Sequence, residues 1–254
     1  MTLRKNIIYR IFYIILLSKG VSDINVVSYG WEVFERNSDS RTLALAQSSI
    51  GYPIQNPGTV LLNPALSLSH NNMIGLTHQS RMSGTSNSEF IGFDKYINDS
   101  SWVSVIILYE GVDGIPDTRG ALLDWGLDGI FGTFDVGEGN GSLDEGERLD
   151  VDKIRFFNQN IFGLYGAHSK IFNNWRIGFG LKIILHTIDK EFGIGAGLDI
   201  GAFRNYNNTG IGLIVKNLPS SGLIWESGNI EISPPSLHFG LHQKFGISKY
   251  GLEI

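Results

Sequence analysis

Apolar and polar residues alternate with a period of two over residues 175–218, the pattern of β-strands with two different faces. One face is apolar throughout and comprises Ile177, Phe179, Leu181, Ile183, Leu185, Ile194, Ala196, Leu198, Ile200, Ala202, Ile211, Leu213 and Val215. The other face is small and partly charged, with glycines interspersed among Lys182, His186, Asp199 and Lys216. A polar interior opposite a lipid-facing band is typical of an outer-membrane barrel. A soluble sheet whose apolar face packs on a core stays open as an alternative.

Eight short segments rich in β-branched and aromatic residues predict roughly eight strands. They cover about 73–81, 88–96, 101–110, 161–171, 175–187, 191–204, 209–218 and 235–246. Short polar connections, such as Asp189-Lys190, suit antiparallel hairpins, and no amphipathic helical stretch separates these later segments. The 32 glycines favour a curved sheet with a crowded interior. We therefore predict an all-β, antiparallel up-and-down transmembrane β-barrel over residues 73–254.

Residues 29–72 lack this alternation. They contain a small-residue stretch at 43–49 and end in Asn63, Pro64 and Ala65 after a passage rich in Pro, Gly and Asn. We predict a short helix and an irregular loop in a plug-like segment. Residues 43–68 are expected to pack inside the sheet or across its mouth and not to form a strand of it.

The first 28 residues have the order of an export signal. Arg4, Lys5 and Arg10 precede the apolar run 11–17, which is too short to span a bilayer as a helix. The cleavage site matches the small-residue rule poorly, so a buried N-terminal helix or strand is the alternative. Because no other segment offers 18 uninterrupted apolar residues, insertion into a membrane would have to use strands.

Composition removes several classes of function. The net charge is −5 with only 20 Lys and Arg, which argues against nucleic acid as a partner, and zero cysteines removes thiolate metal sites and Cys nucleophiles. The glycine-rich stretch 193–201 lacks the G-x-G-x-x-G spacing and continues as a strand. His238 and His242 would lie about 13 Å apart along a strand, too far to bind one metal. We expect no catalytic centre and therefore no enzyme activity.

One passage has the character of a ligand site. The stretch Asp135–Glu147 resembles an EF-hand calcium loop when Gly141 takes the sixth position, although Val136 then occupies the first. The candidate ligands are Asp135, Glu138, Asn140, Asp144 and Glu147. An acidic, glycine-rich surface loop is the alternative. Either way, the long insertion at about 111–160 is expected to face a partner or the cell exterior.

The polar face predicts a charge cluster. A two-residue turn at Asp189-Lys190 would place Lys182 opposite Gly197 and diagonal to Asp199. The next hairpin would bring Lys216 to the same face. Lys182, Asp199 and Lys216 are therefore expected to gather inside the barrel.

Several motifs resemble those of one family. They are Leu43–Leu68 with its Asn63-Pro64-Ala65 ending, Tyr109–Thr118, Gly180–Lys182, Gly197–Gly201, Val215–Leu218 and Pro234–Leu237. In order and spacing they resemble the PorV/PorQ family, whose members are similar to FadL-type outer-membrane barrels. The resemblance implies an outer-membrane location, contact with outer-membrane lipid, and secretion or cargo proteins as partners.

Two other functions stay open beside that one: a FadL-like conduit for hydrophobic small molecules, and a soluble secreted β-protein that binds ligands or surfaces. Family members are usually longer, with about fourteen strands. The last residues, up to Ile254, show no terminal strand that ends in an aromatic residue. A truncated product of a longer gene and closure as a small barrel are both compatible with this ending.

Overall fold

The structure is a computed structural model that describes residues 29–67, 71–244, 246–247 and 252–253. The export signal predicted over residues 1–28 lies outside the described residues. No helix among those described is both long and apolar enough to cross a membrane.

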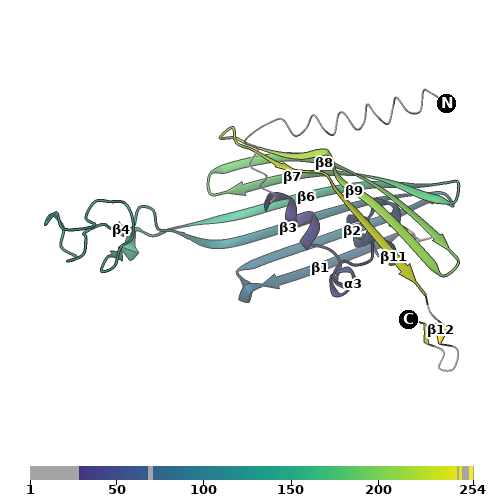
Figure 1. The fold of residues 1–254 in the computed structure, drawn as a ribbon, viewed down its shortest axis with the longest axis horizontal. Coiled ribbons are helices and arrows are strands. Elements are labelled where there is room, and N and C mark those ends of the chain that lie inside the picture. Colours follow the sequence, from purple (N-terminus) through teal and green to yellow (C-terminus); the bar gives the residue numbers. More distant parts are fainter. Residues whose placement is uncertain (1–28, 68–70, 245, 248–251, 254) are drawn as a thin grey trace.

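One antiparallel sheet makes up most of the structure (Figure 1). Its nine strands are β1 (Met73–Arg81), β2 (Ser86–Asn98), β3 (Ser101–Asp117), β6 (Arg155–Phe172), β7 (Trp175–Ile188), β8 (Glu191–Tyr206), β9 (Thr209–Trp225), β10 (Ile230–Ser233) and β11 (Ser236–Gln243). Each pairs with its neighbour in chain order, except that β10 and β11 both pair with β9, at its two ends. β10 and β11 are therefore two parts of one strand along β9, which is interrupted at Pro234 and Pro235. The predicted up-and-down meander is confirmed.

The sheet is open. Within the described residues no ladder joins β1 to β10 or β11, so the structure does not contain a closed barrel. The remaining strands, β12 (Gly246–Ile247) and β13 (Leu252–Glu253), pair only with each other.

Hairpin turns fix the register of the sheet. Asp189 adopts a left-handed φ of 53°, as the tight two-residue turns of hairpins require, and Ile188 pairs with Glu191. Lys182 consequently pairs with Gly197, which confirms the register predicted for this hairpin. The β6–β7 and β8–β9 hairpins also turn through two residues, at the opposite end of the sheet.

Short helices from residues 29–67, here called the plug, lie against one face of the sheet (Figure 1). They are η2 (Tyr29–Glu32), α2 (Val33–Arg36), α3 (Ser40–Ala44), η3 (Pro57–Leu61) and η4 (Pro64–Leu66). Side chains satisfy the free amides at three of their starts: Asp39 caps α3, Asn56 caps η3 and Asn63 caps η4. Over residues 43–67 the chain forms no strand, as predicted.

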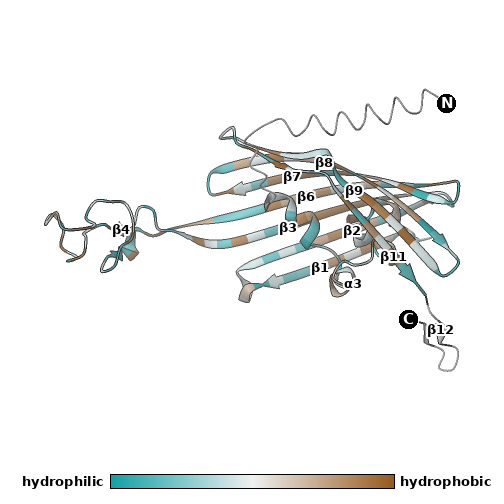
Figure 2. Ribbon diagram, in the orientation of Figure 1, coloured by the Kyte–Doolittle hydropathy of each residue, from teal (hydrophilic) through white to brown (hydrophobic). Residues whose placement is uncertain are grey.

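The two faces of the sheet differ in burial. The face that carries the plug, here the inner face, is buried together with plug residues such as Val60 and Leu66, both 0% exposed. The other, outer face carries the predicted apolar residues in the open: Phe179 is 56% exposed and Leu181 48%. The same alternation continues at Leu76 in β1, at Ile107 in β3 and at Leu237, Phe239 and Leu241 in β11. Figure 2 shows hydrophobic positions alternating with more polar ones along the strands.

The long insertion is shorter than expected, because β3 and β6 extend into it as a two-stranded ribbon. What remains is residues 118–154, here called the projection, which stands well away from the sheet (Figure 1). It contains a small ladder of β4 (Leu122–Leu123) with β5 (Arg148–Leu149), followed by η6 (Val151–Lys153). A further turn, η5 (Met82–Gly84), joins β1 to β2.

Candidate functional site

The Asn63-Pro64-Ala65 turn anchors the plug to the inner face. The Asn63 side-chain amide donates toward the carbonyl oxygens of Ala202 at 3.2 Å and Leu213 at 3.4 Å. Its oxygen accepts from the Ala65 backbone amide at 3.0 Å, which caps η4. One fully buried side chain therefore connects the plug with both β8 and β9.

Two glycines on the inner face leave room for this turn. A β-carbon at Gly178 would stand 2.2 Å from the carbonyl carbon of Pro64, and one at Gly201 would stand 1.9 Å from the side-chain oxygen of Asn63. Both distances are far below van der Waals contact, so these positions require glycine as long as the plug is seated. The crowded interior inferred from the glycine content has this local cause.

The predicted charge cluster forms around two of its three members. The Nζ of Lys182 lies 2.9 Å from Oδ1 of Asp199, and the two side chains are 4% and 2% exposed. The hydroxyl of Tyr165 donates to the other carboxylate oxygen at 3.3 Å, and the backbone amide of Asn217 donates to Oδ1 at 3.0 Å. The carboxylate is thus held by one cation and two hydrogen-bond donors.

Asn217, and not Lys216, completes the cluster. Lys182 donates to the side-chain oxygen of Asn217 at 2.6 Å, whereas Lys216 forms no ion pair with Asp199 in the described part of the chain. The cause is an irregularity in the β8–β9 ladder around Asp199, where Asn217 takes a left-handed φ of 60°. Asn tolerates that conformation better than most residues, but strict two-residue alternation could not indicate where the ladder would slip.

The plug covers this cluster with aromatic rings. Lys182 Nζ lies 5.7 Å from the ring centre of Trp31 and 5.9 Å from that of Phe34. The two rings stack at 5.9 Å. Because a buried cation gains from the negative faces of aromatic rings, the charged interior of the sheet also attracts the plug.

In the projection, carboxylates hold backbone amides. Oδ1 of Asp124 accepts from the amide of Gly139 at 2.7 Å, and Oδ2 accepts from that of Gly141 at 2.7 Å. These bonds, the one from Gly141 above all, lower the pKa of Asp124 below its usual value of 3.8. Sequence reasoning did not single out Asp124, because it lies 15 residues before Gly139 and outside the calcium-like spacing.

The five candidate calcium ligands also form hydrogen bonds within the projection. Asp135 accepts from the amide of Asp128, Glu138 from those of Gly132 and Phe134, and Glu147 from that of Gly126. Asp144 and Asn140 bond to each other through their side chains. Among the described residues, no three acidic or histidine side chains converge as metal ligands would. Calcium binding stays a prediction, and a calcium titration would test it.

We expect Asp124→Asn to loosen the tip of the projection, because a neutral amide holds the amides of Gly139 and Gly141 less strongly than a carboxylate. Hydrogen exchange at these two amides should accelerate, while the amides of β7 stay unchanged. In the wild type, a carboxylate of lowered pKa stabilises above its unfolded pKa of 3.8, so protection should hold from pH 7 to about pH 4. It should disappear as the pH falls further. Unchanged exchange in the variant would contradict this role.

Comparison of the chain with models of protein families, with curated proteins and with solved structures found no match. The resemblance to the PorV/PorQ family therefore rests on the sequence motifs.

Proposed function

We propose that this chain is an outer-membrane protein of the PorV/PorQ type, which inserts its strands in the outer membrane and serves secretion or cargo handling. The observation that carries the proposal is the outward apolar face. Large side chains such as Phe179, Ile194 and Phe239 are 56%, 50% and 63% exposed, while charged Lys182 and Asp199 are buried. This arrangement reverses that of a soluble sheet.

The hydrophobic effect favours a lipid environment for this face. Removing one large apolar side chain from water is favourable by roughly 1.5–3 kcal/mol. Soluble monomers rarely leave apolar patches larger than a few hundred Å² exposed, whereas here apolar side chains recur on the outer face from β1 to β11. A bilayer would cover this face, and the plug already covers much of the inner face.

The arrangement of loops fits the same orientation. Outer-membrane barrels keep short turns on the periplasmic side and long loops outside. Here the hairpins at Asn173-Asn174 and Asn207-Asn208 lie at one end of the sheet, and the projection extends from the other, which also carries the short turn at Asp189-Lys190. The projection would then face the exterior.

The chemistry of the projection favours a protein partner and therefore the secretion or cargo role. Residues 118–154 contain nine acidic and three basic residues, a net charge of −6 against −5 for the whole chain. This charged segment also exposes three apolar side chains to solvent: Phe131 at 76%, Phe134 at 92% and Val136 at 84%. Exposed aromatic side chains in an acidic surface suit a protein surface that is basic and apolar.

Fractionation tests the membrane location. We expect the chain, produced with its own N-terminus in a Gram-negative host, to stay in the outer-membrane pellet after a carbonate wash and to require detergent for release. A Leu181→Arg variant should be assembled poorly, because a charge at the lipid face costs about 2–4 kcal/mol near the bilayer centre. The matched Lys190→Arg variant in a polar turn should behave like the wild type. Recovery of the wild type in the soluble fraction would instead favour the secreted β-protein.

A second experiment separates secretion from a conduit for hydrophobic compounds. Residues 124–147 would be replaced by a short Gly/Ser linker, and envelope extracts would be tested for proteins that bind the wild type. Loss of a specific partner in this variant would support the cargo role. Uptake of a hydrophobic compound that depends on the chain but not on residues 124–147 would support the conduit.

A further inference from the structure

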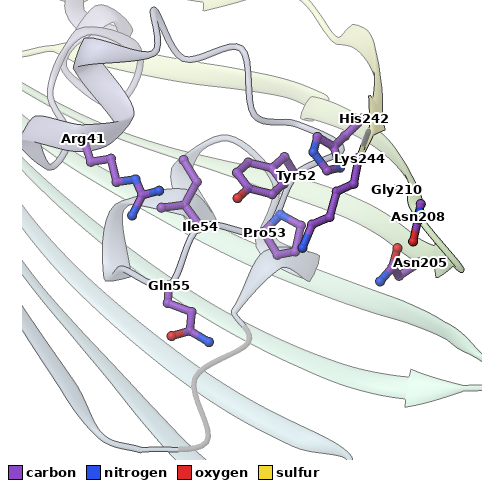
Figure 3. A pocket seen from close by; sticks show the side chains of 10 residues that line it. All are labelled: Arg41, Tyr52, Pro53, Ile54, Gln55, Asn205, Asn208, Gly210, His242 and Lys244. Atoms are coloured by element: carbon purple, nitrogen blue, oxygen red, sulfur yellow. The ribbon is translucent and has the colours of Figure 1, made fainter. Parts of the chain in front are cut away.

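A cavity of about 300 Å³ lies between the plug and the end of the sheet that carries the β8–β9 turn. It is lined by Arg41, Tyr52, Pro53, Ile54, Gln55, Asn205, Asn208, Gly210, His242 and Lys244. These residues come from α3, from the loop before η3, from the β8–β9 hairpin and from the end of β11. Figure 3 shows Arg41 and Lys244 extending toward the space from different sides, with Tyr52 beside His242.

The walls of this cavity, here called the rim cavity, are basic. Among the described residues, Arg41 and Lys244 line it and no Asp or Glu does, although the chain as a whole is acidic. In the described part of the chain neither cation forms an ion pair. Two uncompensated positive charges therefore face one concave space.

A second cavity of about 550 Å³ adjoins the first, since Pro53 and Asn205 line both. It adds Arg176 and Arg204 and, within the described part of the chain, again no carboxylate. Arg176 is partly buried with its Nε unbonded, and its guanidinium carbon lies 4.2 Å from the ring centre of Trp102. The positive potential at the rim thus extends beyond the rim cavity.

The local structure holds the rim cavity open. The rings of Tyr52 and His242 lie 4.2 Å apart, which fixes the loop of the plug against β11. A β-carbon at Gly212 would stand 1.9 Å from the carbonyl oxygen of Ile50, so the same loop is seated directly on the backbone of β9. The backbone amide of Lys244 donates to the carbonyl of Asn208 at 2.8 Å, which places Lys244 over the β8–β9 turn.

We propose that the rim cavity binds a phosphate group, either free or as the headgroup of an anionic lipid. Guanidinium and ammonium groups supply charge-assisted hydrogen bonds, and the amides of Gln55, Asn205 and Asn208 supply neutral donors from other directions. A phosphate offers oxygens in several directions and up to two negative charges, which matches donors spread around a space better than a planar carboxylate does. This site goes beyond the proposed function and does not depend on it.

Calorimetry on the full chain in a non-ionic detergent tests the site with two probes, inorganic phosphate and short-chain phosphatidylglycerol. We expect at least one probe to bind, and the Arg41→Gln/Lys244→Gln variant to bind it at least about tenfold more weakly, since each lost charge-assisted bond contributes more than a neutral one. The matched Arg148→Gln/Lys190→Gln variant removes the same charges at the far end and should bind like the wild type. Tighter binding of the lipid would identify a headgroup, and tighter binding of inorganic phosphate a free anion.

Absence of heat with both probes would overturn the proposal, as would equal loss in the matched variant or wild-type affinity in the double variant. Circular dichroism and the melting temperature would establish that the double variant is folded. If it is not, Lys244→Gln changes only an exposed residue after β11, and a smaller loss of affinity in the same direction is expected from it.

Discussion

Replacing Asp199 with alanine should lower the free energy of unfolding by about 3–5 kcal/mol, the usual cost of removing one partner from a buried ion pair. Lys182 would be left 4% exposed with no counter-ion, and the Tyr165 hydroxyl would lose its acceptor. Urea unfolding in detergent, followed by tryptophan fluorescence, measures the change. Trp31 should report it, because its ring lies over Lys182.

Two controls sharpen this experiment. Ile211→Val changes the outer face and should cost no more than about 0.5–1.5 kcal/mol. Lys182→Met combined with Asp199→Leu removes both charges and should recover part of the stability, since no buried charge is left unpaired. The recovery should be incomplete, because the Tyr165 hydroxyl and the Asn217 amide still lose their acceptor. If Asp199→Ala unfolds at the same urea concentration as the wild type, the pair is not buried and the assignment of the two faces is wrong.

Replacing Gly178 with valine should unseat the plug and cost about 3 kcal/mol, the upper end of the range for overpacking. The new side chain would meet the backbone of Pro64 and Ala65, which cannot move aside as a flexible side chain can. Protease digestion should then cut within residues 29–67 faster than in the wild type, where many of these residues pack on the sheet.

Gly166→Val is the matched control. Gly166 lies in the adjacent strand β6, and a β-carbon there would meet nothing within 4 Å. The same substitution should therefore leave both stability and digestion close to those of the wild type. Equal damage from both variants would show that valine disturbs the strands in general and that the plug is not the cause.

Most of the main sheet could be predicted from local pattern. β1 begins and ends at the predicted residues 73 and 81, and the β7–β8 register followed from the turn at Asp189-Lys190. The pattern succeeded because each strand separates apolar from small or polar residues at every second position, so a shift by one residue would have reversed its faces. The ion pair between Lys182 and Asp199 followed from the same register, which places the two residues diagonally across β7 and β8.

Other features depend on contacts that no local pattern records. The bulge that brings Asn217 to Lys182 depends on the fit between β8 and β9. The continuation of β3 to Asp117 depends on pairing with β6, whose first residues lack clear alternation. The amides held by Asp124, and the basic lining of the rim cavity, join residues that lie far apart in the sequence.

The seating of Asn63 against Ala202 also has a kinetic consequence. These two residues are 139 positions apart, and the contact joins one of the first described segments to one of the last strands. Contacts between distant residues form slowly, because a long loop must close before they stabilise anything. The plug is synthesised before β8 and β9 but would reach its final place only once both strands have formed. A refolding experiment should therefore show strand formation before the burial of Trp31, so that β8 and β9 provide the surface on which the plug is finally seated.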